Sequence, residues 1–139
     1  MSGMIETYRG AVYPWHCDHM GHMNVMWYVG KFDEATWFLL SQLGLTAAVL
    51  RENSRGMVAV EQTLQYRREL LAGDVINIHS RVLELKEKSI RFQHEMRKED
   101  SDEVAATTTL VGVHIDTTVR RACPLPALVS ARLKDLAAA

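Results

Sequence analysis

The spacing of hydrophobic residues changes along the chain from one position in every three or four to every second position. Between Met26 and Leu43 the apolar residues recur at helical spacing, no proline interrupts them, and Gly44 follows. Glycine is common directly after the end of a helix because it adopts the left-handed conformation needed there. The pattern therefore predicts one helix of about five turns over residues 26–43.

Strands are predicted both before and after this helix in the sequence. Hydrophobic and polar residues alternate in four later segments, which cover residues 57–66, 75–85, 89–98 and 103–116. A short strand is predicted before the helix, at Thr7–Tyr13, and a short helix at the end, over residues 124–139. This order indicates an α+β fold with an antiparallel sheet. One face of that sheet needs an apolar cover, so we predict a curved sheet wrapped around the long helix.

Two strands give predictions about individual faces. In residues 89–98, the apolar positions and His94 alternate with charged and polar positions, which predicts one buried and one wet face. In residues 58–66, the same period places Val58 and Leu64 on one shared face.

Composition limits the kinds of protein that fit. The 139 residues are 47% hydrophobic and 24% charged, which is typical of one globular domain, here residues 1–139. A net charge of -1 does not supply the basic field that nucleic-acid binding needs. Two cysteines without a CxxC pair, a charged N-terminus and no apolar run of about 18 residues favour a cytoplasmic protein without a membrane segment.

Candidate chemistry is concentrated in the stretch YPWHCDHMGHMNVMWY, residues 13–28. It is consistent with a catalytic loop or with a metal site built from His16, Cys17, Asp18, His19 and His22. The histidines recur every three residues and would converge on a metal if the segment were helical, but the glycine between them argues against a helix. No HExxH motif or second ligand cluster follows, so we predict no metal. Three later histidines are predicted to make ordinary hydrogen bonds within the sheet: His79, His94 and His114.

The segment CDHMGHMNVMWYVGKFDEATWFLLSQLGL resembles the active-site loop and central helix of hotdog-fold acyl-CoA thioesterases, in the 4-hydroxybenzoyl-CoA thioesterase-like branch. The D-x-x-G-H-x-N motif followed by Tyr28 carries this resemblance, and the YRRELLAGD and KEKSIRF segments extend it over nearly the whole chain. The resemblance implies an antiparallel sheet wrapped around a long central helix. It also implies hydrolysis of an acyl-CoA to a free acid and CoA, with no metal or redox cofactor.

In that family the acid three residues before the glycine is the catalytic carboxylate, which here is Asp18, before Gly21. Such a carboxylate either attacks the thioester carbonyl or deprotonates a water molecule, and the sequence does not separate the two routes. Taken without the resemblance, Asp18 fits a loop or cap carboxylate that binds backbone amides better than it fits a catalytic acid, and the resemblance reverses that preference.

The start of the helix supplies the second half of the expected site. A helix that begins after the loop directs free N–H groups toward the developing oxyanion, and the resemblance places the key amide at Val25. Asn24 is predicted as the helix N-cap, with a role in orienting water or substrate as the alternative. His22 could orient Asp18, hold the water or shape the acyl pocket.

Further substrate contacts follow from the resemblance alone. Gly21 and Tyr28 are expected beside the substrate, and CoA phosphates are expected to meet Lys86, Lys88 and Ser89, with Arg67 or Arg68 as additional candidates. His16 stands where some relatives carry an additional acid, so its role stays open.

Two other carboxylates compete with Asp18, because another hotdog branch uses an acid on the central helix. Glu34 lies on the predicted helix in a polar stripe, and Glu61 interrupts an apolar strand where it could line a pocket. Core and acyl-pocket walls are predicted from six bulky residues: Trp15, Trp27, Trp37, Met20, Met23 and Met26.

The family pairs subunits edge to edge with active sites at the interface, so a homodimer or homotetramer is expected. The alternative to hydrolysis is a hotdog protein that binds acyl thioesters or hydrates enoyl thioesters. The sequence does not define the acyl group, nor whether CoA or a carrier protein bears it.

Overall fold

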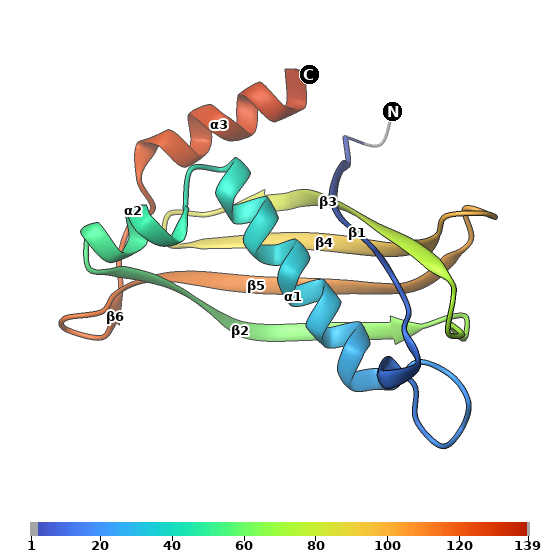
Figure 1. Cartoon of the computed structure of the whole chain (residues 1–139). Helices are drawn as coiled ribbons and strands as arrows, with labels where there is room; N and C mark the ends of the chain where they lie inside the picture. Colours follow the sequence, from blue (N-terminus) through green and yellow to red (C-terminus); the bar gives the residue numbers. More distant parts are fainter. Residues whose placement is uncertain (1–2, 139) are drawn as a thin grey trace.

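One antiparallel sheet organises the chain (Figure 1). The computed structural model describes residues 3–138. Its strands are β1 (Ile5–Ala11), β2 (Arg55–Tyr66), β3 (Val75–Leu85), β4 (Ser89–Lys98), β5 (Val104–Asp116) and β6 (Arg121–Ala122). They pair in the order β1-β3-β4-β5-β2, and β6 pairs with β5. Strands β1 and β2 are therefore the two edges of the main sheet.

Three helices accompany the sheet: α1 (Val25–Gln42), α2 (Ala47–Glu52) and α3 (Ala127–Ala138). Helix α1 crosses one face of the sheet, while α2 and α3 lie toward the end where β3 meets β4 (Figure 1). The predicted helix over residues 26–43 agrees with α1 to within one residue at each end. No helix within residues 3–138 is long and apolar enough to cross a membrane.

The core forms between α1 and the sheet because one stripe of the helix is apolar. Tyr28, Phe32, Ala35 and Leu39 recur at helical spacing and are all buried. Burying a side chain as large as Phe32 stabilises the fold by about 1.5–3 kcal/mol. A second apolar cluster, which includes Leu39, continues under α2 and α3.

Strand β4 has the faces that its sequence predicts. Ile90, Phe92, His94 and Met96 are buried, and the residues between them are partly or fully exposed. The His94 ring also joins the sheet to the helix: Nδ1 shares a hydrogen bond with the Ser80 hydroxyl, and Nε2 lies 2.9 Å from Thr36 Oγ1 on α1. The prediction of an ordinary sheet histidine is confirmed at this position.

The predicted shared face of β2 is wrong because the strand contains a bulge between Ala59 and Glu61. Val58 lies opposite Val113 on β5, whereas Leu64 lies opposite Thr108, which belongs to the buried face of β5. An extra residue moves every later side chain to the other face of a strand. Val58 is therefore exposed, and Leu64 packs against the core.

Several element boundaries differ from the prediction. Strand β1 begins and ends two residues before the predicted Thr7–Tyr13, and a 3-10 helix follows at Pro14–His16. Helix α2 was not predicted, although Thr46 caps it by accepting a hydrogen bond from the Val49 amide. Helix α3 begins three residues after the predicted start at residue 124, and the predicted end at Ala139 lies outside the described residues.

Candidate active site

The loop before α1 folds back on itself and brings its two arms together. Cys17 and Met23 pair as an isolated bridge, the Asp18 amide donates to the His22 carbonyl at 3.2 Å, and the turn closes where the Gly21 amide donates to the Asp18 carbonyl. Gly21 has φ +88°, a conformation that other residues rarely adopt. The glycine of the motif therefore permits the turn that displays Asp18.

The Asp18 carboxylate is fixed by two hydrogen bonds. Oδ2 accepts from Asn24 Nδ2 at 2.7 Å, and Oδ1 accepts from the Met20 amide at 2.9 Å. These bonds, the one from Asn24 first, hold the pKa of Asp18 below its usual value. The side chain is partly exposed, so an ionised carboxylate is presented to solvent at neutral pH.

Asn24 also caps α1. Its side-chain oxygen accepts from the Met26 amide at 2.9 Å, and its carbonyl accepts from the Trp27 amide, so the predicted N-cap is confirmed. Val25 lies between Asn24 and Met26 in the sequence, and its amide has no acceptor in the described chain. A free N–H at the positive end of the helix dipole is suited to bind an oxygen that gains negative charge.

A cavity of about 390 Å³ opens beside this helix start. Its lining combines the loop and the first turn of α1 with the end of β2 and the segment that follows it: His22, Met23, Val25, Tyr28, Tyr66, Arg67, Arg68 and Glu69. A space of this size accommodates an organic ligand. The fold thus brings predicted residues from distant parts of the chain to one cavity: His22, Met23, Val25, Tyr28, Arg67 and Arg68.

Tyr28 forms the inner wall of this cavity. Its hydroxyl donates to the Arg68 carbonyl at 3.0 Å, and its ring packs edge-on against Tyr66. Burial raises the pKa of Tyr28 to about 12, so the hydroxyl stays protonated across the physiological range. Through this bond the helix holds the segment that carries Arg67 and Arg68.

His22 faces Glu69 across the cavity mouth, with Nε2 3.8 Å from the Glu69 carboxylate. Between His22 and the Asp18 side chain, no hydrogen bond forms in the described residues. Of the roles expected for His22, the geometry favours shaping the cavity over orienting Asp18.

His16 is not among the residues that line this cavity. Its Nδ1 accepts a hydrogen bond from the Tyr13 amide at 3.0 Å, and its ring packs against Trp27 with 4.4 Å between centroids. Burial, and then the nearby Lys31 ammonium, hold the pKa of His16 below its usual value. A neutral ring wedged between the loop and α1 indicates a packing role.

The residues predicted to meet CoA lie far from Asp18 in the same chain. Lys86, Lys88 and Ser89 form the turn between β3 and β4, whereas the loop that carries Asp18 follows β1, whose last residue pairs with the first residue of β3. The 11 residues of β3 span about 33 Å between these ends. Within one chain, these residues and Asp18 therefore lie at opposite ends of the sheet.

The two rival carboxylates do not lie beside the helix start. Glu34 is exposed on α1, and Glu61 is exposed at the bulge of β2 rather than lining a pocket among the described residues.

Most of the six bulky residues lie outside the core, while Met23 both belongs to the core and lines the cavity beside Val25; the role of the others as acyl-pocket walls stays a prediction. Met23 is buried and Trp27 partly buried, but Trp15 is 68% exposed and Met20 66%. Met26 and Trp37 are exposed as well. A helical or loop pattern of large apolar residues does not by itself distinguish a core face from a surface that binds another molecule.

Comparison with known proteins identifies the family. The family model described as Thioesterase-like superfamily matches residues 12–133, which includes the loop, α1 and all of the main sheet except β1. The chain belongs to this superfamily. The predicted class of enzyme, a thioester hydrolase that acts on acyl-CoA, is confirmed at the level of this family.

Individual relatives of this thioesterase agree with that assignment. A betainyl-CoA thioesterase from Pseudomonas aeruginosa is 24% identical over 139 residues, which are 100% of this chain and 87% of that protein. A gentisyl-coenzyme A thioesterase structure is 28% identical with a TM-score of 0.80, over 91% of this chain and 98% of that one. A Staphylococcus aureus protein solved with CoA is 20% identical and has a TM-score of 0.90, over 97% of this chain and 85% of that one. The shared fold is the curled antiparallel sheet with helices of the hotdog thioesterases.

The histidines of the thioesterase loop do not converge. Within residues 3–138, no group of three or more His, Cys, Asp or Glu side chains is arranged to hold a metal ion.

Sequence reasoning assigned ordinary hydrogen bonds to all three sheet histidines, but Nδ1 of His79 and Nε2 of His114 are buried without a partner in that part of the chain. An alternating strand pattern contains no signal for such an orphaned atom.

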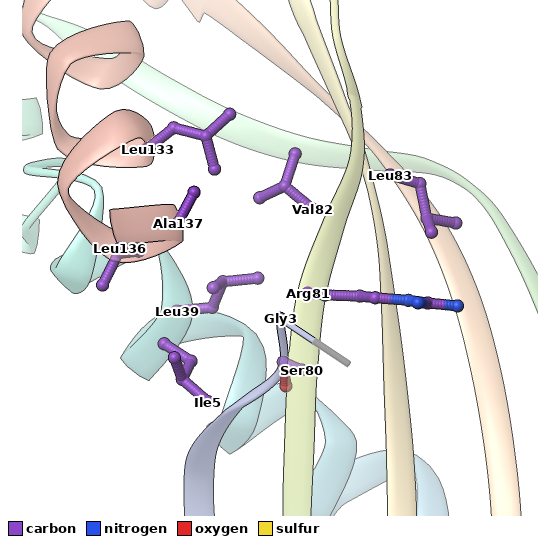
Figure 2. A pocket seen from close by; sticks show the side chains of 10 residues that line it. All are labelled: Gly3, Ile5, Leu39, Ser80, Arg81, Val82, Leu83, Leu133, Leu136 and Ala137. Atoms are coloured by element: carbon purple, nitrogen blue, oxygen red, sulfur yellow. The ribbon is translucent and has the colours of Figure 1, made fainter. Parts of the chain in front are cut away.

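A further cavity of the thioesterase lies between α3 and β3 (Figure 2). It measures about 350 Å³, and its walls include Leu133 and Leu136 from α3, Val82 from β3 and Leu39 from α1. The Ser80 hydroxyl at its floor already binds Thr7 and His94. This cavity contains none of the predicted site residues and offers no free reactive group among its described side chains.

Proposed function

We propose that this thioesterase hydrolyses its acyl-CoA substrate with the Asp18 carboxylate, while the Val25 amide polarises the thioester carbonyl. The observation that carries the proposal is that Asn24 links the two groups. Its side-chain nitrogen donates to Asp18, and its side-chain oxygen caps the helix that begins at Val25. A carboxylate and an unpaired amide held by one residue supply the two needs of thioester cleavage, a nucleophile or base and an oxyanion donor.

The state of Asp18 supports this role. Its lowered pKa keeps it ionised at neutral pH, as both direct attack and deprotonation of water require. Direct attack would form a mixed anhydride and release the CoA thiolate, and water would then cleave the anhydride. In the general-base route, Asp18 takes a proton from water, whose oxygen attacks the carbonyl; the C–S bond then breaks, and CoA leaves as the thiolate, which takes the proton back. In either route, the Val25 N–H stabilises the negative charge that develops on the carbonyl oxygen.

The cavity next to Val25 is the place we assign to the part of the substrate around the thioester. His22 and Tyr28 shape its walls, and Gly21 permits the turn of the loop that carries His22. Arg67 and Arg68 lie at its rim, where guanidinium groups favour the negative charges of CoA. The proposed hydrolysis uses no metal or redox cofactor. CoA enters as part of the substrate.

We also propose that the thioesterase acts as one domain over residues 1–139, in the cytoplasm, and assembles as a homodimer or homotetramer through β2. Edge strand β2 is 12 residues long and exposes Val58 and Val60. The other edge, β1, has seven residues, a bulge and the ion-paired Glu6 and Arg9, features that discourage edge pairing.

Antiparallel pairing of two β2 strands about a two-fold axis reverses one sheet relative to the other. The end of one copy that carries Lys86, Lys88 and Ser89 then lies on the same side as Asp18 of its partner. This arrangement is consistent with CoA contacts from the partner copy.

A thiol-release assay tests the proposal. The purified protein is incubated with a panel that includes betainyl-CoA, gentisyl-CoA, and short-chain, branched and long-chain acyl-CoAs, with the same acids linked to a carrier protein as a second set. Release of CoA with formation of the free acid from at least one member is the expected result. Binding of acyl-CoAs without release, or hydration of an enoyl-CoA in its place, would contradict the proposed hydrolysis.

A further inference from the structure

His16 lies beside the first turn of α1, at the end of the short 3-10 helix, and does not line the cavity beside Val25. Its ring packs against Trp27 of that turn with 4.4 Å between centroids, and it meets the rings of Tyr13 and Trp15 edge-on. Only 8% of the residue is exposed. The ring is therefore enclosed between the segment that follows β1 and the helix that begins the proposed site.

Hydrogen bonds connect His16 to both arms of the loop. The Tyr13 amide donates to Nδ1 at 3.0 Å, and the His16 amide donates back to the Tyr13 carbonyl at 2.9 Å. On the other arm, the Asn24 amide donates to the His16 carbonyl at 2.9 Å. Asn24 is the residue whose side chain binds Asp18 and caps α1. His16 thus links the segment before the loop directly to the residue on which the proposed site depends.

The contact at Nδ1 determines the protonation state of the ring. A backbone N–H can only donate, so Nδ1 must be the acceptor, with a lone pair and no hydrogen. The ring is then neutral and carries its hydrogen on Nε2. A second proton can enter only at Nδ1, where it would face the Tyr13 N–H and break this hydrogen bond.

The surroundings of the ring also favour its neutral state. Burial lowers the pKa of His16 most, the Lys31 ammonium lowers it further, and the Glu34 carboxylate raises it. Both charged residues belong to α1, and the titratable neighbour on the loop side is Tyr13. Lys31 is 3% exposed and donates to the Tyr8 hydroxyl at 3.1 Å, so its charge is held in place. An imidazolium at this position would be buried near a fixed positive charge.

We propose that His16 is a positioning residue of the thioesterase: through an uncharged acceptor at Nδ1, it holds the loop against the start of α1 and so fixes Asp18 relative to the Val25 amide. This inference rests on the proposed function, because it gives the geometry of those two groups a catalytic consequence. Protonation of the ring releases the Tyr13 amide and loosens the arm of the loop that leads to Asp18. The organised site is therefore present above pH 6.5, the ordinary pKa of histidine, and is lost as pH falls through the lowered pKa of His16.

The pH dependence of kcat separates His16 from Asp18. The pKa of Asp18 lies below its usual 3.8, so Asp18 alone predicts a kcat that is constant down to about pH 4. If His16 positions the loop, kcat on the best acyl-CoA of the panel falls already below pH 6.5, while circular dichroism shows a folded protein. His79→Asn removes a histidine of β3 that lies opposite Glu95 of β4, and it should retain this fall.

Two substitutions at His16 test the acceptor itself. His16→Asn retains an acceptor oxygen near the position of Nδ1 but cannot titrate, whereas His16→Leu retains bulk without an acceptor. At pH 8 we expect the kcat of His16→Leu to be about tenfold lower than that of the wild type with KM unchanged, because displaced reacting groups slow the chemical step. His16→Asn should recover most of this loss, and its kcat should no longer fall below pH 6.5.

NMR follows the same loop without substrate. Nδ1 of His16 should carry no hydrogen at pH 8, and protonation of the ring should shift the amides of Tyr13 and Asn24. A wild-type kcat in His16→Leu at every pH, a fall below pH 6.5 that persists in His16→Asn, or a hydrogen on Nδ1 at pH 8 would each overturn the proposal. Full activity of Asp18→Asn would instead contradict the proposed function, and the amide shifts would then still decide whether His16 holds the loop.

Discussion

Asn24 donates a hydrogen bond from Nδ2 to Asp18 Oδ2 at 2.7 Å, and its side-chain oxygen caps α1. One amide side chain thus fixes the carboxylate relative to the helix start. Its two ends have separable functions, because Nδ2 serves Asp18 and Oδ1 serves the Met26 amide. Substitutions at Asn24 can therefore distinguish a catalytic arrangement from a helix cap.

Asn24→Asp keeps an oxygen for the cap, removes the donor to Asp18 and adds a second negative charge. We expect turnover to fall by about tenfold or more, because hydrogen bonds to charged groups contribute about 1.5–3 kcal/mol. The pKa of Asp18 should rise, since its largest lowering cause is lost, and the acidic limb of the rate profile should move to higher pH. Steady-state kinetics between pH 4 and 9 measure both effects.

Thr46→Ala is the matched control, because Thr46 caps α2 in the same way without contacting Asp18. It should lower stability by about 1 kcal/mol and leave the pH profile unchanged. An Asn24→Asp variant with wild-type turnover and an unshifted profile would show that Asn24 does not hold a catalytic Asp18.

Tyr28→Phe removes the hydroxyl that binds the Arg68 carbonyl and leaves the buried ring in place. We expect the free energy of unfolding to fall by about 1 kcal/mol, and KM for acyl-CoA to rise because the cavity rim is no longer held. Urea unfolding and kinetics provide the two measurements. Tyr13→Phe, at an exposed position, should change neither quantity, and identical behaviour of the two variants would refute the positioning role of Tyr28.

His94 makes stability depend on pH. Burial lowers its pKa from 6.5 to about 4, so between these values the unfolded chain binds a proton that the folded chain does not. Stability contributed by the neutral ring is therefore present above pH 6.5 and is lost as pH falls toward 4, by at most about 1.4 kcal/mol per pH unit.

Urea unfolding of the wild type and of His94→Gln at several values from pH 4.5 to 7.5 measures this slope. The variant lacks the titrating ring, so its stability should fall less steeply toward acid pH. His19→Gln, in the exposed part of the loop, should retain the wild-type slope. Equal slopes in the wild type and His94→Gln would contradict the assignment.

Val60→Lys places a charge at the bulge of edge strand β2, where the side chain is 60% exposed. In the proposed assembly this position is covered, so sedimentation velocity should show the variant as a single chain and the wild type as a dimer or tetramer. Val119→Lys changes an equally exposed residue outside the sheet edge and should sediment as the wild type does. A wild type that stays monomeric at micromolar concentration would contradict the proposed pairing.

The sequence was most informative where a long element has one regular period. The bounds of α1 and the buried face of β4 follow from spacing alone, because many consecutive side chains contribute to each pattern. The faces of β2 do not follow, since one extra residue at the bulge reverses the alternation. Helix α2 is only six residues long, too short to establish a period.

Site residues divide in a similar way. Asp18 and Val25 were predicted from the family resemblance, and Asn24 as the helix cap from its place before the helix; these residues lie close in sequence, and the loop brings Asp18 and Asn24 into contact. Contacts that depend on tertiary packing were missed, among them Tyr28 with Arg68 and His114 with Cys123. Lys86 and Lys88 lie at the far end of the sheet from Asp18. In the proposed assembly they would contact CoA bound by a partner copy, which the pattern of one chain cannot place.

The central claim is that Asp18 performs the hydrolysis. Its most direct test measures thiol release by the wild type and by Asp18→Asn on the best substrate of the acyl-CoA panel, with Asp135→Asn on the exposed face of α3 as the control. We predict that Asp18→Asn loses at least about a thousandfold in turnover, as expected when a nucleophile or base is removed, while Asp135→Asn stays fully active. Circular dichroism and sedimentation should be unchanged in both variants. Full activity of a folded Asp18→Asn would contradict the account and transfer the catalytic role to another carboxylate.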